Sequence, residues 1–209
     1  KGAKSVYGEE EFARLYGEIE AVAEERVRAM ADNEELAWGG RVLRFLDTPG
    51  HASHHCCIHD SATNGVFTGD AFGLGRNERL RPGPSFVIAS SAPPDFDAAE
   101  AKKSARRIVD TGAQLAYLTH YGALTDLEKC ADQLVRSLDA LQAIVEDALA
   151  QEIPDEELQA FCERGVENAT REHLRACGVA DVEADYHWLE SDTAIDAMGL
   201  AVAVQRRRK

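Results

Sequence analysis

Three side chains that are able to bind a metal each follow an apolar stretch of the sequence. His51 comes after RFLDTPG, Asp70 ends VFTGD, and His120 ends LAYLTH. Imidazole nitrogen and carboxylate oxygen suit zinc, iron and manganese, and a metal with an open coordination position can generate hydroxide near neutral pH. Taken singly, each residue also has an ordinary explanation, because Gly-Asp is commonly a turn and a histidine after a strand is commonly a structural hydrogen-bonding residue. Their occurrence together, each at the end of an apolar strand that can direct it into a cleft, favours a metal site.

The histidines and cysteines that follow His51, between residues 54 and 59, have a structural interpretation. We treat His54 and His55 as supporting or structural residues, and His59, beside a predicted hairpin turn, as structural too. Cys56 and Cys57 lie in an apolar segment, where cysteine behaves as a small buried hydrophobe. We therefore expect one ligand in this stretch and no cysteine nucleophile.

The elements that must position these residues are short strands and one helix. Apolar segments predict strands over residues 41–47, 55–59, 66–68 and 114–119. Asn64-Gly65 accepts the positive φ of a tight hairpin turn. Residues 73–95, rich in Gly, Pro and Ser, predict a long loop that covers or lines a site. Asp97 predicts the N-cap of a helix over 98–109.

Helices are predicted on both sides of this region. Residues 9–30 place apolar side chains at three- and four-residue steps, which is typical of a surface helix with one buried face. After Thr125 the pattern is helical to the end, and Thr125 and Glu128 have capping-box spacing. A last short apolar helix is predicted over 194–204.

Composition limits the class of protein. The chain has 209 residues, of which 44% are hydrophobic, enough to bury a core. A net charge of -14 argues against nucleic acid as a partner. The five cysteines show no C-x-x-C spacing, which fits a reducing cytoplasm, and no segment approaches the roughly 20 apolar residues that cross a membrane. We expect a core domain over 1–125 and a helical region over 126–209 packed on it.

Three segments of the sequence resemble, in order and approximate spacing, the third, fourth and fifth metal-binding motifs of the metallo-β-lactamase-fold hydrolases. These segments are TPGHASHH, GVFTGDAFG and AYLTHYG. This superfamily includes the glyoxalase II thioesterases, the lactonases and the diiron domain of flavodiiron proteins. The resemblance covers about residues 36–125. It implies an α+β fold, a four-layer αββα sandwich with metals at the sheet edge. It also implies that His51 ligates the first of two ions, Asp70 bridges both, and His120 ligates the second, with zinc expected and iron or manganese as alternatives.

The sequence departs from the family at its first two motifs. These motifs, H-x-H-x-D-H, normally precede the other three, whereas no histidine occurs before His51. The residues named above cannot complete a two-metal site, since each ion takes about four ligands. We expect the motif to lie upstream of Lys1 in the complete protein, so that the N-terminal part of the sandwich is missing here. The alternative is a non-catalytic relative.

The resemblance implies a metal-dependent hydrolase in which metal-activated hydroxide attacks an ester-like, thioester or lactone carbonyl. Asp70 then acts as ligand and orients the nucleophile. Phe72 and Tyr121 are candidates for contact with a small-molecule substrate, although packing explains both residues as well. A homo-oligomer is compatible with the sequence.

Two other functions remain open. One is a diiron redox protein related to flavodiiron proteins or to the iron persulfide dioxygenases, because GDAFG also resembles the flavodiiron segment after the bridging Asp. Nothing after residue 125 resembles a flavin-binding domain. The other is a binding or scaffold protein that has kept the fold and lost its metals.

Overall fold

The computed structural model describes residues 8–76, 83–92, 95–120 and 122–208, in two units divided after Met30. In the first unit, helix α2 spans Glu9–Tyr16 and a single 3-10 turn, η1, spans Glu24–Arg26. The predicted helix over 9–30 is therefore wrong beyond its first third. Gly17, at φ 63°, ends α2, and Ile19 is 67% exposed although the pattern predicted it to be buried.

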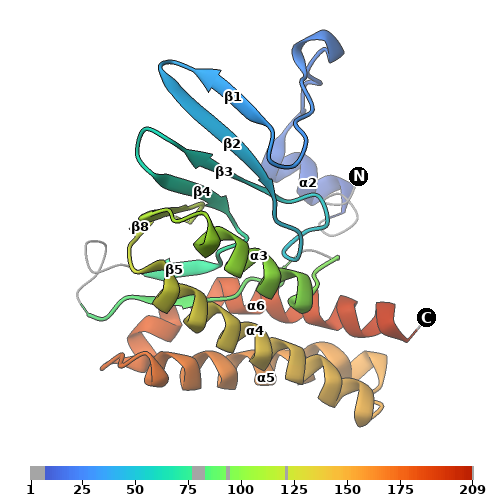
Figure 1. Cartoon of the computed structure of the whole chain (residues 1–209). Helices are drawn as coiled ribbons and strands as arrows, with labels where there is room; N and C mark the ends of the chain where they lie inside the picture. The colour runs from blue at the N-terminus through green and yellow to red at the C-terminus, as the bar shows by residue number, and fades with distance from the viewer. Residues whose placement is uncertain (1–7, 77–82, 93–94, 121, 209) are drawn as a thin grey trace. The chain divides into compact units, whose positions relative to one another are not determined.

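The second unit contains a six-stranded sheet in the order β1-β2-β3-β4-β7-β8 (Figure 1). Its strands are β1 (Glu35–Trp38), β2 (Arg41–Asp47), β3 (Cys56–Asp60), β4 (Gly65–Gly69), β7 (Leu115–Leu118) and β8 (Ala123–Leu124). The β4–β7 pair is parallel and the other neighbours are antiparallel. The four predicted strands are confirmed, as is the hairpin turn, where Asn64 has φ 47°. Strand β1 was not predicted.

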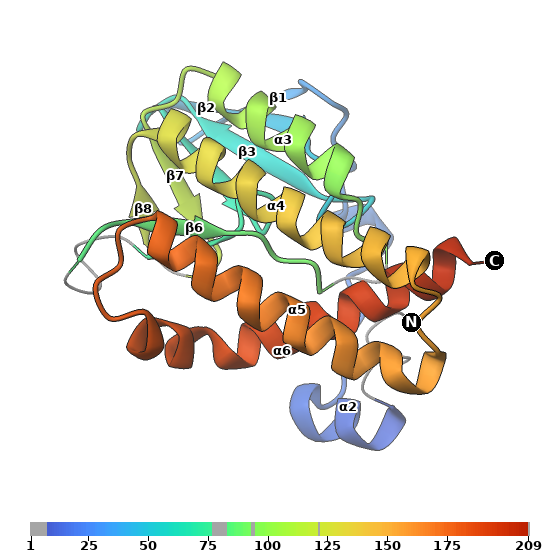
Figure 2. The ribbon, with the colours of Figure 1, turned by 90° about the horizontal axis from the view of Figure 1, so that it is seen from below.

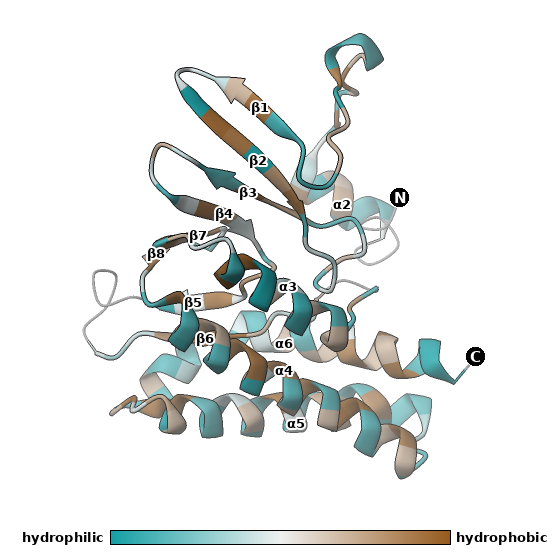
Figure 3. Cartoon of the chain, viewed as in Figure 1, coloured by the Kyte–Doolittle hydropathy of each residue, from teal (hydrophilic) through white to brown (hydrophobic). Residues whose placement is uncertain are grey.

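The two faces of this sheet differ in burial. One face is buried beneath helix α3 (Ala98–Asp110) and belongs to the main core; it carries Leu46, Cys57, Val66 and Ala116. The opposite face carries a cross-strand row, in register, of Phe45, Ile58, Phe67 and Tyr117. In this row Phe67 is 48% exposed, and its ring stacks 4.8 Å from that of Tyr117. Strand β2 is hydrophobic along much of its length (brown in Figure 3) because residues on both faces are apolar.

A second, two-stranded sheet lies where the sequence predicted only a loop. Strands β5 (Leu74–Arg76) and β6 (Phe86–Ile88) pair antiparallel, so the prediction of a loop over 73–95 is wrong for these residues. Every residue of both strands is buried. Short strands buried on both faces lack the alternation of polar and apolar residues that reveals a half-buried strand.

Three long helices form the C-terminal region and lie side by side (Figure 2). They are α4 (Leu127–Ala150), α5 (Asp155–Ala176) and α6 (Val182–Arg207). The N-cap of α4 is Asp126, whose carboxylate accepts from Lys129 N, rather than the predicted Thr125. Helix α6 begins well before the predicted start at Ala194. Its first turns carry charged residues, one of which, Asp185, forms a buried ion pair with Arg76 of β5.

The architecture is thus the predicted mixture of sheet and helices, with helices at the C-terminal end. Asp97 caps α3 as predicted, accepting from Ala99 N and Glu100 N at 2.9 and 3.1 Å. The domain division at residue 125 stays a prediction. Within the described ranges, no helix combines the length and the apolar character needed to cross a membrane.

A glycine ends β4 and sets the direction of the chain into Asp70. Gly69 has φ 50°, in the left-handed region that favours glycine. A Cβ placed there would lie 2.4 Å from Nε2 of His55. Both the backbone angle and the space beside His55 therefore require glycine at this position.

We expect Gly69→Ala to lower the free energy of unfolding by about 1–3 kcal/mol more than Gly112→Ala does. Gly112 is the matched control, because its φ of 71° imposes a similar backbone strain while nothing lies within 4 Å of its missing Cβ. Urea unfolding of the two variants measures the difference. Equal losses would show that His55 does not crowd Gly69.

A buried carboxylate on α6 is held by hydrogen bonds from serine residues. Asp196 is 2% exposed and accepts from Ser91 N at 2.6 Å. The pKa of Asp196 is raised to about 7 because burial, together with the charge of the neighbouring Asp192, outweighs the hydrogen bonds from Ser91 and Ser90, which act in the opposite direction. The folded protein therefore holds a proton here at a pH where the unfolded chain has lost it.

This raised pKa predicts a pH-dependent stability difference between the wild type and Asp196→Asn. As pH rises from about 4 to about 7, Asp196 ionises in the unfolded chain but not in the folded one, so the wild type loses stability. The Asn variant lacks that loss, and its relative stability should rise by up to about 1.4 kcal/mol per pH unit before levelling off. Urea unfolding of both proteins across this pH range measures it. A pH-independent difference would contradict the assignment.

Candidate metal centre

Strand direction brings the three predicted ligands to one edge of the six-stranded sheet. Strands β2 and β4 run in the same direction, since both are antiparallel to β3, and β7 is parallel to β4. His51 follows β2 after a short turn, Asp70 follows β4 directly, and His120 follows β7. All three side chains therefore leave the sheet at the carboxyl ends of their strands.

The carboxylate of Asp70 lies between the two imidazoles. Its Oδ2 atom is 3.6 Å from Nε2 of His51, and its Oδ1 atom is 3.1 Å from Nε2 of His120. The His51 side chain is largely buried, with 13% exposed, whereas that of His120 is 49% exposed. The site is thus closed on the His51 side and open to solvent on the His120 side.

A backbone carbonyl fixes the tautomer of His51. Nδ1 of His51 lies 3.3 Å from the carbonyl oxygen of Ser90, which can only accept a hydrogen bond. Nδ1 must therefore carry the proton. Burial lowers the pKa of His51, while the charge of Asp70 acts in the opposite direction. In the neutral ring Nε2 has a free lone pair on the side of Asp70. A metal-ligating histidine likewise donates one N–H to a carbonyl and keeps the lone pair of the other nitrogen for the metal.

The donor atoms suit a cation. Oδ1 of Asp70 is buried and has no hydrogen-bond partner among the described residues, because its approach to His120 lacks hydrogen-bond geometry. A buried carboxylate oxygen without a partner is costly unless a cation satisfies it. Even so, no group of three or more His, Cys, Asp or Glu within the described residues is arranged to hold a metal ion. The three residues fit a metal in their chemistry and do not form a closed coordination sphere.

His55 holds the backbone of Asp70. The amide N–H of Asp70 donates to Nε2 of His55 at 3.1 Å, so Nε2 is an acceptor and Nδ1 carries the proton. Nδ1 then donates to Oγ1 of Thr48 at 3.0 Å. Both ring nitrogens of His55 are occupied, and this histidine is a support for the loop, as predicted from the sequence.

The hydrogen-bond chain continues into the core in a single direction. Thr48 Oγ1 lies 3.1 Å from Sγ of Cys57, whose thiol donates to the carbonyl of Thr68 at 3.3 Å. Because the chain starts at an amide that can only donate and ends at a carbonyl that can only accept, each intermediate group accepts one bond and donates the next. Burial raises the pKa of Cys57 to about 12, so the thiol keeps the proton that it donates.

The other predicted residues are exposed, have other contacts or lie outside the described residues. His54 is exposed, and His59 contacts Oδ1 of Asn64 at 3.1 Å. Phe72, a candidate for substrate contact, has no exposed surface and packs in the main core. Tyr121 lies outside the described residues, and its substrate contact stays a prediction.

Helix α6 places a carboxylate near His120 that was not predicted from the sequence. Burial raises the pKa of Asp192, and the nearby His120 acts in the opposite direction. The signal was hidden because the predicted helix began at Ala194, after this residue. A helical reading of the polar segment from Val182 would have placed Asp192 on the same helix as Asp196.

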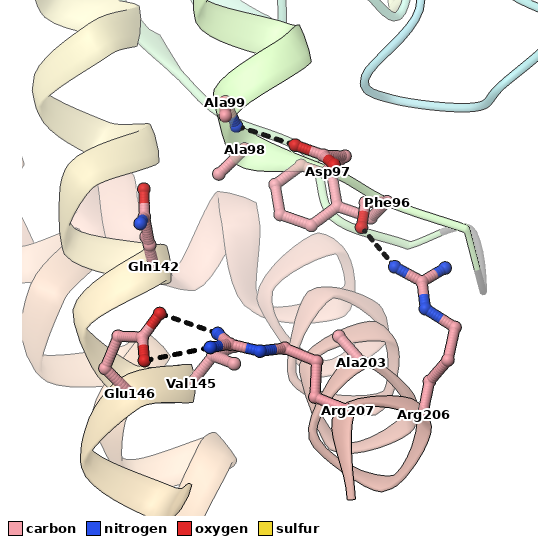
Figure 4. Close-up of a pocket in the computed structure, with 10 residues that line it drawn as sticks. All are labelled: Phe96, Asp97, Ala98, Ala99, Gln142, Val145, Glu146, Ala203, Arg206 and Arg207. Atoms are coloured by element: carbon pink, nitrogen blue, oxygen red, sulfur yellow. Dashed lines mark hydrogen bonds and ion pairs between the residues drawn. The ribbon is translucent and has the colours of Figure 1, made fainter. Parts of the chain in front are cut away.

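A cavity of about 300 Å³ lies between the start of α3 and helices α4 and α6 (Figure 4). Its charged groups pair with neighbours: Arg207 binds Glu146 at 2.6 and 3.1 Å, and Arg206 donates to the carbonyl of Phe96 at 3.1 Å. None of the three predicted ligands lines it. This cavity is therefore distinct from the candidate metal centre.

Known proteins resemble part of this chain in sequence and in structure. A curated relative, the metallo-beta-lactamase fold-containing protein ST1585 of Sulfurisphaera tokodaii, is 28% identical over 112 residues, which are 53% of this chain and 39% of the relative. The crystal structure of ST1585 from Sulfolobus tokodaii has a TM-score of 0.50 at 27% identity, covering 67% of this chain and 48% of that one. A metallo-beta-lactamase family protein from Thermus thermophilus has a TM-score of 0.47 at 20% identity, covering 99% and 60%.

The chain spans 39% of the curated relative and 48% of the first solved structure. A sequence profile described as the metallo-beta-lactamase superfamily matches residues 3–120, more than half of the 209 residues. This match includes all three predicted ligands and the strands that carry them. The chain belongs to the metallo-beta-lactamase superfamily.

Proposed function

We propose that the protein is a metal-dependent hydrolase whose metal is held by His51, Asp70 and His120. The observation that carries this proposal is the Asp70 carboxylate, which directs one oxygen toward each imidazole. Imidazole and carboxylate donors suit zinc, with iron or manganese as alternatives. Two ions are expected in the complete protein, with Asp70 shared between them.

When bound, such a metal lowers the pKa of a coordinated water and polarises a carbonyl oxygen. The residues of the chain supply orientation. Asp70 accepts a proton from, or orients, a nucleophilic water beside it. The hydrogen bond that the Asp70 amide N–H donates to Nε2 of His55 prevents the Asp70 backbone from turning away. His51 is oriented by the Ser90 carbonyl. The expected substrate is a small molecule with an ester-like, thioester or lactone carbonyl.

A second candidate is a binding protein that has kept the fold and lost its metals. It is favoured by one observation, that the described residues contain no group of three or more His, Cys, Asp or Glu arranged to hold a metal ion. The two proposals differ in the metal content of the protein expressed from its full reading frame.

We expect Asp70→Ala to lose metal and hydrolysis together. The substitution removes the one negative charge between two imidazoles, and we expect at least about a 100-fold loss of activity, the upper end of what outer-shell substitutions cause. His51→Ala and His120→Ala each remove one neutral ligand and should weaken mainly one ion. Elemental analysis and hydrolysis of a panel of thioesters and lactones measure these effects.

His54→Ala is the matched control, since His54 is an exposed histidine beside His51 in sequence. It should keep metal content and activity near those of the wild type. A full metal complement in Asp70→Ala, or a loss in His54→Ala equal to that in His51→Ala, would place the site on other residues. A wild-type protein without metal or hydrolysis would favour the binding protein.

A further inference from the structure

Side chains from the C-terminal helices bind the backbone of strand β6. One edge of β6 pairs with β5, and the other edge faces the helices. On that edge the N–H of Val87 donates to Oε1 of Gln133, on α4, at 3.1 Å. The carbonyl of Val87 lies 2.8 Å from Nε2 of His173, on α5, which must be the donor. A single residue of β6 is thus held by two helices.

The same arrangement continues past the end of β6. The N–H of Ala89 donates to Oγ of Ser137, on α4, at 3.0 Å. The N–H of Ser91 donates to Oδ1 of Asp196, on α6, at 2.6 Å, and Oγ of Ser91 donates to the backbone carbonyl of Asp196 at 3.1 Å. Alternate residues 87, 89 and 91 therefore bind side chains of the helices instead of another strand.

Helix α6 approaches this segment too closely for any side chain at one position. A Cβ on Gly199 would lie 1.8 Å from the carbonyl oxygen of Ser91 and 2.8 Å from its carbonyl carbon. Both atoms belong to the backbone, so they cannot move aside as the end of a flexible side chain can. Gly199 allows the contact, and Asp196, one turn earlier, makes the hydrogen bond across it.

The segment over residues 87–91 contains the carbonyl oxygen that orients a predicted ligand, His51. Ser90 lies between the two held residues, Ala89 and Ser91, and its carbonyl accepts from Nδ1 of His51. Asp196 and Ser91 are 2% and 0% exposed, so water does not compete for this hydrogen bond. The position of the Ser90 carbonyl, and with it the rotation of the His51 ring, depends on helix α6.

We propose that Asp196 is a positioning residue for His51, acting through the backbone of Ser90 and Ser91. The hydrogen bonds of Asp196 go to Ser91 rather than to a predicted ligand. The inference rests on the proposed function only in naming His51 as a metal ligand; the dependence of the His51 ring on Asp196 is a statement about the chain alone. The helical region thereby contributes to the metal centre without supplying a ligand.

The test compares Asp196→Ala with Asp196→Asn and Asp181→Ala. The Ala variant leaves Ser91 N without an acceptor, whereas the Asn variant keeps an acceptor oxygen and should keep the wild-type His51 tautomer and zinc affinity. Asp181 is the matched control, because it too accepts a hydrogen bond from a backbone amide, in its case Ala184 N of α6 at 3.1 Å. Among the described residues, no hydrogen bond joins Asp181 to residues 87–91. All variants are made in the protein expressed from its full reading frame.

Two readouts are required. In nitrogen-15 NMR spectra of the metal-free proteins the wild type, Asp196→Asn and Asp181→Ala should show His51 as the Nδ1–H tautomer, and Asp196→Ala should show a mixture of tautomers. Zinc affinity, measured with a competing chelator dye, should fall by about 10–100-fold in Asp196→Ala alone. An unchanged His51 tautomer in folded Asp196→Ala would overturn the inference, whatever the zinc affinity.

If Asp196→Ala does not fold, Gly199→Ala replaces it. The added methyl group must displace the Ser91 carbonyl, so the His51 tautomer should change although the Asp196 carboxylate is still present. A wild-type His51 signal in this variant would overturn the inference. A wild type that shows the Nδ1–H tautomer and binds no zinc would contradict the proposed function and leave the positioning role of Asp196 supported.

Discussion

The direction of strands β2, β4 and β7 is the constraint on which the candidate site depends. Because all three run the same way, the residues that follow them emerge at one edge of the sheet. Asp70 follows the central strand of the three and so lies between the two histidines. Reversing any one strand would send its ligand to the opposite edge. The backbone hydrogen bonds of the sheet therefore select which side chains meet.

Buried polar groups then fix how these side chains are oriented. The chain from the Asp70 amide through His55, Thr48 and Cys57 to the Thr68 carbonyl satisfies each group once. Such a network favours one arrangement because losing any member leaves a buried partner unsatisfied. In contrast, Oδ1 of Asp70 is buried without a hydrogen-bond partner among the described residues. A cation site requires both features: supporting groups whose hydrogen bonds are satisfied, and a carboxylate oxygen that a cation can bind.

Much of this arrangement could be predicted where the signal is local. The positive φ of Asn64, the Asp97 cap and the strands before Asp70 and His120 depend on neighbouring residues, and short-range patterns revealed them. Strands β5 and β6 were missed because they are buried throughout and one edge of β6 is held by helix side chains rather than by a strand. The role of Asp196 was missed because its partner, Ser91, lies 105 residues away in sequence. Periodicity within one segment contains no information about such contacts.

The most direct test of the metal centre is the anomalous scattering of crystals grown with zinc and measured on both sides of the zinc absorption edge. The account predicts an anomalous peak about 2.0–2.2 Å from an Asp70 carboxylate oxygen and from Nε2 of His51 or His120. Nε2 of His55 should still accept the hydrogen bond from the Asp70 amide, and the His55 ring should lie outside the coordination sphere. A zinc peak on exposed His54 with none beside Asp70, in crystals of the protein expressed from its full reading frame, would contradict the account.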